Sequence, residues 1–213
     1  MEFKISKQLE DYRNSINFMD SHINNMISNN QEDLVWFLEY PNIYTYGPLS
    51  NKEDLLKPRK FPVIPSERGG QYTYHGPGQR VVYVMLDLNK RGRDIKKFVE
   101  NIEAWIIHAL AEFNVVGQSR KGRVGIWVER PDKPKNINGF LEEEKIAAIG
   151  VRLRKWVTFH GLSINVDPNL SHFQGIIPCG IKEYGVTSLI DLGLPVSMTD
   201  LDIALAKSFS KVF

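Results

Sequence analysis

The sequence predicts an α/β domain built on a mixed sheet, and three observations support this fold class. Residues 5–27 and 94–113 carry apolar side chains at helical spacing. Short runs rich in β-branched and aromatic residues lie between and after them. Two such runs, 123–129 and 145–151, follow each other like the strands of a hairpin, which a strict alternation of strands and helices would not give. No boundary or repeat divides the chain, so we expect a single domain over residues 1–213.

The first expected helix covers residues 5–27. Its apolar residues alternate between steps of three and four along the chain and form one stripe, made up of Ile5, Leu9, Tyr12, Ile16, Met19, Ile23 and Met26. Such a stripe can bind a partner, but amphipathic helices usually pack on their own domain, so we expect it to face the core. Ser28, Asn29 and Asn30 mark its end.

Two strands and a second helix are expected next. Residues 34–39 and 81–88 read as buried strands, and the charged, proline-interrupted stretch 51–65 between them reads as a loop. Residues 94–113 are expected to form a helix whose apolar face contains Ile95, Phe98, Val99, Ile102, Trp105, Ile106 and Leu110.

The C-terminal half completes the sheet. The strands expected here are residues 123–129, 145–151 and 158–166, with an exposed loop over 131–140. A last helix is expected over residues 199–212, with Thr199 as its N-cap ahead of Asp200 and Asp202.

Composition and charge exclude several classes of protein. Lys and Arg total 27 against 25 Asp and Glu, and a net charge of +2 argues against bulk nucleic-acid binding. The longest apolar run, residues 81–86, is far below the roughly 18 residues of a membrane span. The N-terminal segment lacks the pattern of a secretory or transit peptide. A single cysteine, Cys179, cannot form an internal disulfide, so we expect a reducing, cytoplasmic compartment.

A glycine-rich segment, RGGQYTYHGPGQ, occupies residues 68–79 directly before an expected buried strand. Glycines this dense allow backbone amides to approach a ligand closely, although the segment matches neither a P-loop nor a dinucleotide fingerprint. Arg68 would clamp an anion and His75 would transfer protons near neutral pH. A long turn whose histidine satisfies backbone groups explains the same residues, and the two interpretations remain open.

The segment IIPCGI, residues 176–181, places Cys179 between Pro178 and Gly180. A lone cysteine is often buried and inert, but a turn can present its thiol to a ligand. A nucleophilic thiol must be ionised, and a nearby cation would favour the thiolate. Lys145, His75 and His160 are the candidates for that cation.

Each of these candidates also has a structural interpretation. Lys145 begins a strand and would ordinarily be a solvated strand end, whereas in a cleft it would carry protons. His160 begins HGLSIN and is more typical of a structural histidine. The histidines and the cysteine show no metal-ligand spacing.

Four segments in a fixed order resemble the lipoyl(octanoyl) transferase family. They are RGGQYTYHGPGQ (68–79), KIAAIGVR (145–152), HGLSIN (160–165) and IIPCGI (176–181), followed by GVTSL (185–189). The ordered combination is specific, whereas each segment alone is weak. One segment departs from the family pattern, because YTYGPLS (44–50) has Pro48 where a basic residue is common.

The resemblance implies a fold like the catalytic domains of lipoate and biotin protein ligases. It also implies a reaction, in which octanoyl moves from octanoyl–acyl carrier protein to a lysine of a lipoyl domain, as the first step of endogenous protein lipoylation. The acceptors would be the lipoyl domains of 2-oxoacid dehydrogenase complexes and the glycine cleavage H protein, with no nucleic acid or membrane as partner. No cofactor is implied, because a thioester already carries the activation.

The same resemblance assigns roles to residues. Cys179 would be the nucleophile that forms the acyl thioester, and Lys145 the partner that favours its thiolate and handles protons. The acyl pocket would be lined by Arg68, Gly69, Gly70, Gln71, Tyr72, Thr73, Tyr74, His75, Ala148, Ile149, Gly150, Gly161, Leu162 and Ser163.

Three other functions fit parts of the sequence. An ATP-dependent lipoate–protein ligase shares the implied fold but needs no cysteine nucleophile. A thiol hydrolase would use Cys179 with His75 or His160 and water as the acceptor. A non-catalytic module would bind the acyl group or its carrier without turnover.

Overall fold

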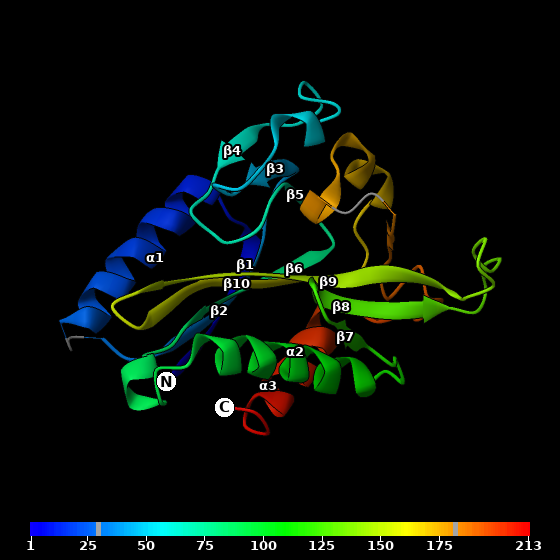
Figure 1. Ribbon diagram of the computed structural model, residues 1–213. Coiled ribbons are helices and arrows are strands. Elements are labelled where there is room, and N and C mark those ends of the chain that lie inside the picture. Colours follow the sequence, from blue (N-terminus) through cyan, green and yellow to red (C-terminus); the bar gives the residue numbers. More distant parts are fainter. Residues whose placement is uncertain (29–30, 181–182) are drawn as a thin grey trace.

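In its described residues, the protein has a large mixed sheet, a small sheet and three helices (Figure 1). The computed structural model describes residues 1–28, 31–180 and 183–213. The large sheet has the order β1-β2-β6-β10-β9-β8-β7, and β11 pairs with β9 beside this path; the small sheet has the order β4-β3-β5. Parallel pairs (β1 with β2, β9 with β11 and β3 with β4) accompany antiparallel ones, which confirms the expected mixed α/β class.

The strands of the large sheet are β1 (Glu2–Leu9), β2 (Leu34–Glu39), β6 (Gln79–Met85), β7 (Gln118–Arg120), β8 (Arg123–Arg130), β9 (Glu142–Arg154), β10 (Val157–Asn165) and β11 (Gly185–Val186). The small sheet contains β3 (Ile43–Tyr46), β4 (Val63–Pro65) and β5 (Thr73–His75). The helices are α1 (Tyr12–Ile27), α2 (Ile95–Ala111) and α3 (Met198–Phe209). Short 3-10 turns cover Lys52–Asp54, Leu88–Lys90, Leu170–Gly175 and Pro178–Gly180.

Two apolar layers cover opposite faces of the large sheet. Helices α2 and α3 pack on one face, where Trp105 and Leu205 join side chains from β6, β8, β9 and β10. Helix α1 packs on the other face through Met19 and Ile23, next to the small sheet (Figure 1). Aromatic side chains such as Tyr44 and Tyr74 form a third cluster under the small sheet. The small sheet and α1 therefore share one face of the large sheet, and the candidate site lies on that face.

The N-terminal expectation of one helix over residues 5–27 is wrong at its start. Residues Glu2–Leu9 form β1, an edge strand parallel to β2, in which Ile5 and Leu9 are exposed. The helix begins only at Tyr12, because the Asp11 carboxylate accepts the Asn14 N–H at 2.9 Å and caps it. The stripe from Tyr12 onward does face the core, as expected. Asn29 and Asn30, expected near the helix end, lie outside the described residues.

The other expected elements are confirmed with shifted ends. Strand β2 has the predicted bounds, and α2 starts after its cap Asp94, although Ile95 is exposed rather than part of the buried face. The N-cap of α3 is Ser197 and not Thr199, because Ser197 and Asp200 form a reciprocal capping box. The expected loop 51–65 ends in strand β4, which pairs with β3.

No helix in the described part of the chain is long and apolar enough to cross a membrane.

Candidate active site

Cys179 lies in a tight turn that the protein holds in an uncommon backbone conformation. Its φ of 56° and ψ of 19° place it in the left-handed region, where non-glycine residues are rare. The Cys179 N–H donates to the Tyr72 carbonyl at 2.9 Å, and the Ile177 N–H donates to the Asp54 carbonyl at 2.8 Å. These bonds tie the turn to the glycine-rich loop and to the small-sheet region. Cys179 is half-buried and forms no disulfide with any described residue. Ile181, the last residue of the IIPCGI segment, lies outside the described residues.

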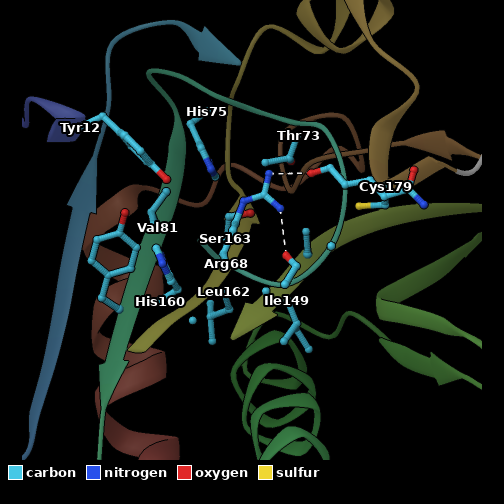
Figure 2. Close-up of a pocket in the computed structure, with 17 residues that line it drawn as sticks. Tyr12, Arg68, Thr73, His75, Val81, Ile149, His160, Leu162, Ser163 and Cys179 are labelled. Atoms are coloured by element: carbon cyan, nitrogen blue, oxygen red, sulfur yellow. Dashed lines mark hydrogen bonds between the residues drawn. The ribbon is translucent and has the colours of Figure 1, made fainter. Parts of the chain in front are cut away.

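The cysteine borders two adjoining pockets. The first holds about 490 Å³ of space including its open mouth, and it is lined by Tyr12, Arg68, Gly69, Gly70, Gln71, Thr73, His75, Val81, Tyr83, Ala148, Ile149, Gly150, His160, Gly161, Leu162, Ser163 and Cys179. Cys179 and Tyr12 lie at opposite ends of this pocket in Figure 2. The second pocket is smaller and contains Lys145 together with Cys179, Thr73, Ala148 and Ser163. The Cys179 thiol therefore lies between the elongated first pocket and the smaller second pocket, which contains Lys145.

The structure brings together most of the residues that the sequence assigned to an acyl pocket. Of the fourteen, only Tyr72 and Tyr74 are not among its lining residues. The Tyr74 hydroxyl instead donates to Asn42 Oδ1 at 2.7 Å, and the Tyr72 ring packs 5.4 Å from that of Tyr46. Alternation along residues 72–75 turns these two side chains into the aromatic cluster under the small sheet, while Thr73 and His75 face the pocket.

Arg68 does not present a free guanidinium to an anion. Its side chain is buried and donates to the carbonyls of Thr45, Gly69 and Gln71 at 2.7–3.0 Å, and two of these bonds are drawn in Figure 2. Burial lowers the pKa of the guanidinium from its usual value. Arg68 is therefore a buried cation whose hydrogen bonds fix the conformation of the glycine-rich loop next to Cys179, rather than a residue that is free to bind an anion.

The glycine-rich loop lies directly against β9. A Cβ atom at Gly150 would come within 2.9 Å of the Gly69 carbonyl, and one at Gly47 within 2.2 Å of the Gly70 carbonyl. These contacts explain why glycine is required at both positions, because a side chain would push the loop away. They also show that the 44–50 segment, which departs from the family pattern, packs on the glycine-rich loop.

Lys145 reaches the site because of an irregularity in β9. Ile126 of β8 pairs with Ala147, but the next residue, Trp127, pairs with Lys145, so Ile146 is an extra residue and forms a β-bulge. Ile146 and Ala147 both belong to the layer under α2 and α3, and Lys145 faces the opposite side. Lys145 is 5% exposed, so it is not a solvated strand end. Its Nζ has no hydrogen-bond partner among the described residues.

The two histidines of the pocket are neutral at physiological pH. Burial lowers the pKa of His75 to about 4, and His75 Nδ1 lies 2.6 Å from Gln79 Oε1. Burial also lowers the pKa of His160 to about 3, and its Nε2 has no hydrogen-bond partner within the described part of the chain. His75 is therefore not a proton carrier near neutral pH. Gln79 Nε2 donates to Asn165, whose amide donates to the Thr187 carbonyl, so the histidine belongs to a buried polar chain.

Four pocket residues were not assigned to the pocket from the sequence: Tyr12, Val81, Tyr83 and His160. Tyr12 had been placed in the core stripe of the first helix. Val81 and Tyr83 alternate along β6, and that alternation was a usable signal because it puts both side chains on one face. Within the described residues there is no group of three or more His, Cys, Asp or Glu side chains that would hold a metal ion.

Comparison with known proteins agrees with this geometry. A family model described as the lipoyl protein ligase A/B catalytic domain matches residues 11–210. The octanoyltransferase of Dinoroseobacter shibae is 58% identical over 213 residues, which are 100% of this chain and 97% of that protein. The chain belongs to the octanoyltransferase family. Bartonella quintana has another similar octanoyltransferase, 53% identical over 100% of this chain and 87% of its own length.

Solved structures show the fold of this octanoyltransferase family member. A crystal structure of lipoate-protein ligase A bound with ATP has a TM-score of 0.74 at 16% identity, covering 100% of this chain and 85% of that one. A putative lipoate protein ligase from T. acidophilum with bound lipoic acid has a TM-score of 0.67 at 17% identity, covering 99% and 85% of the two chains. The expected likeness to ligase catalytic domains is confirmed.

Proposed function

We propose that this protein transfers an octanoyl group from octanoyl–acyl carrier protein to a lysine of a lipoyl domain, through a thioester on Cys179. Octanoyl transfer is the activity for which its full-length relatives are named. The observation that supports the route is the position of the Cys179 thiol between an elongated, partly apolar pocket and the buried Lys145. Residues 1–213 act as one catalytic domain in this proposal.

The first step forms the acyl-enzyme. The Cys179 thiolate attacks the carbonyl carbon of the octanoyl thioester, a new C–S bond forms, and the bond to the carrier's thiol breaks. The leaving thiolate takes a proton from the Lys145 ammonium. The octanoyl tail lies in the pocket along Val81, Ala148 and Gly161, and each buried methylene contributes about 0.8 kcal/mol.

The second step releases the product. Neutral Lys145 accepts a proton from the ammonium of the target lysine, whose amine then attacks the thioester carbon. The C–N bond forms as the C–S bond to Cys179 breaks, the remaining excess proton of the attacking nitrogen passes to solvent, and the thiolate is restored. Lys145 returns to its charged form, so the proton donated in the first step is recovered in the second.

The two pocket histidines are poorly suited to activate water as the acceptor. A thiol hydrolase would use His75 or His160 to activate water, but burial keeps the pKa of both rings far below neutral pH. His75 Nδ1 is hydrogen-bonded to Gln79, and His160 lines the pocket but not the chamber around Lys145. Lys145 is the titratable side chain that shares the second pocket with the thiol.

Intact-protein mass spectrometry tests the proposal. We expect one octanoyl adduct after the protein is mixed with octanoyl–acyl carrier protein, and its loss when a lipoyl domain is added and gains the same mass. The Cys179→Ser variant should form no adduct that transfers, whereas His108→Gln, on the exposed face of α2, should behave as the parent. An unmodified parent whose lipoyl domain is acylated only with ATP and free acid would overturn the proposal in favour of a ligase.

A further inference from the structure

Trp127 is a buried aromatic residue that lies outside the apolar core. It is 1% exposed, yet its neighbours in β8, Ile126 and Val128, pack under α2 and α3 while its own ring faces the other side of the sheet. There the indole lies opposite Lys145 across the β8–β9 pair. A tryptophan in this position contributes little to either core layer, so its placement needs another explanation.

The indole ring is the close partner of the Lys145 ammonium. Lys145 Nζ lies 4.7 Å from the centre of the Trp127 ring, within the range of a cation–π contact. Nearby carboxylates are engaged elsewhere: Glu143 with Arg123, and Glu144 with Arg130 and Lys133. Within the described residues, Lys145 Nζ has no hydrogen-bond acceptor. The face of the Trp127 ring therefore provides the attractive contact that a carboxylate would otherwise provide for the ammonium, without neutralising its charge.

The Trp127 ring is itself held in place by contacts with Arg123 and Tyr184. Trp127 Nε1 donates to the Arg123 carbonyl at 2.9 Å, and the Arg123 guanidinium lies 4.6 Å from the ring centre. Tyr184 packs edge-on at 5.2 Å, and Arg123 is held by Glu143 at 2.6 Å. Gly125, with a φ of +121°, leaves room for the lysine stem, because a Cβ there would lie 3.3 Å from Lys145 Cε.

We propose that Trp127 is a positioning residue, whose ring holds the charged Lys145 side chain beside Cys179. An ion pair with a carboxylate would hold the lysine as firmly, but it would also cancel the charge that favours the thiolate. A ring holds an ammonium with about the strength of an exposed ion pair and carries no net charge. The catalytic purpose given to Trp127 rests on the proposed function. The experiment that tests its effect on Lys145 and Cys179 does not require octanoyl transfer.

The test measures the rate at which iodoacetamide alkylates Cys179 across pH, which needs no acyl donor. With Trp127→Leu we expect alkylation at pH 7 to slow about fivefold and the rate profile to move to higher pH, because Lys145 is no longer held near the thiol. Trp127→Phe keeps a ring and should recover most of the rate. In a Lys145→Met background, Trp127→Leu should have no further effect, because the ring acts through the lysine.

Trp36→Leu is the matched control. Trp36 is also buried and also lies under a lysine, with Lys4 Nζ 4.3 Å from its ring centre, but it lies in β2 away from Cys179. It should lower stability without moving the alkylation profile. An unchanged profile in Trp127→Leu, an equal effect in the Lys145→Met background, or the same slowing in Trp36→Leu would each overturn the proposal.

A second measurement covers the case in which Trp127→Leu does not fold. Fluorinated tryptophan at position 127 keeps the shape of the ring but weakens its attraction for a cation. We expect alkylation at pH 7 to slow stepwise with the number of fluorines, and a rate independent of fluorination would overturn the proposal. Failure of octanoyl transfer in the parent would leave both measurements interpretable, because alkylation does not depend on it.

Discussion

The backbone N–H of Cys179 donates a hydrogen bond to the carbonyl oxygen of Tyr72, at 2.9 Å. This single bond joins the turn that carries the thiol to the loop that forms the rim of the elongated pocket. A displacement of the loop therefore moves the thiol as well. The four predictions below follow from how the loop, the thiol, the lysine and the pocket are held relative to one another.

Replacement of Lys145 by methionine should slow octanoyl transfer by about 10²- to 10⁴-fold with little change in thermal stability. Methionine fills the same buried space, but it cannot carry a proton between the two steps. Single-turnover acylation and transfer, measured separately by mass spectrometry, should both be slow. Normal transfer by Lys145→Met, with melting unchanged, would remove the lysine from the mechanism.

The two pocket histidines should make the protein less stable in mild acid. Both have a folded pKa well below the unfolded value of about 6.5, so the unfolded chain binds more protons between those values. The free energy of unfolding should therefore fall as pH drops from 7.5 to 5.5, by about 1 kcal/mol for each histidine. Urea denaturation of His160→Gln should show a shallower pH dependence than the parent, whereas the exposed His108→Gln should match the parent.

Gly150→Ala should impair acyl binding more than folding. The added Cβ would lie 2.9 Å from the Gly69 carbonyl, so the glycine-rich loop must shift away from β9. We expect KM for the octanoyl donor to rise about tenfold. Gly117→Ala is equally crowded, at 2.8 Å, but against an Ile126 methyl rather than against the loop. That control should lose stability with KM unchanged; equal KM effects in the two variants would contradict the prediction.

Val81→Phe should change the preferred acyl length. Val81 lines the pocket from β6 on the α1 side of the large sheet, and a larger ring there takes up space that the acyl chain would occupy. Loss of room for two methylenes costs about 1.6 kcal/mol of binding, or roughly 15-fold in affinity. Competition between octanoyl and hexanoyl donors should therefore shift toward hexanoyl. An unchanged ratio would mean that the chain does not pass Val81.

Much of the fold and site could be predicted because the relevant residues lie in short continuous segments. Strand β2 is a continuous apolar run and helix α2 has apolar residues at helical spacing, so both could be predicted locally. The segments around Gly69, Lys145 and Cys179 could be recognised because each is a short continuous motif. The start of the first helix could not be predicted, since Ile5 and Leu9 continue the helical spacing of α1 by coincidence. Their strand conformation depends on pairing with β2, which is a contact distant in sequence.

The residues missed at the site depend on tertiary structure in the same way. Tyr12 enters the pocket from a helix whose buried residues Met19, Ile23 and Met26 face the core. Simple alternation along β9 would put Lys145 on the opposite face from Ala148 and Gly150, because the intervals of three and five are odd. The bulge at Ile146 corrects this parity, and a bulge has no reliable signature in one sequence.

The bulge at Ile146 also determines where residues can be inserted into the chain or deleted from it. Removal of the Ile146 codon would restore regular pairing and leave Lys145 opposite Trp127 on the face of the site, because the interval from Lys145 to Ala148 becomes two. An extra codon between Lys145 and Ala147, with the bulge retained, would instead place Lys145 opposite Val128, in the layer beneath α2 and α3, where a charged ammonium would be buried without a partner. Insertions in the turn at residues 131–141 leave this parity intact, because they come before the strand begins. Insertions compatible with activity should therefore be found in that turn and not within the six positions from Lys145 to Gly150.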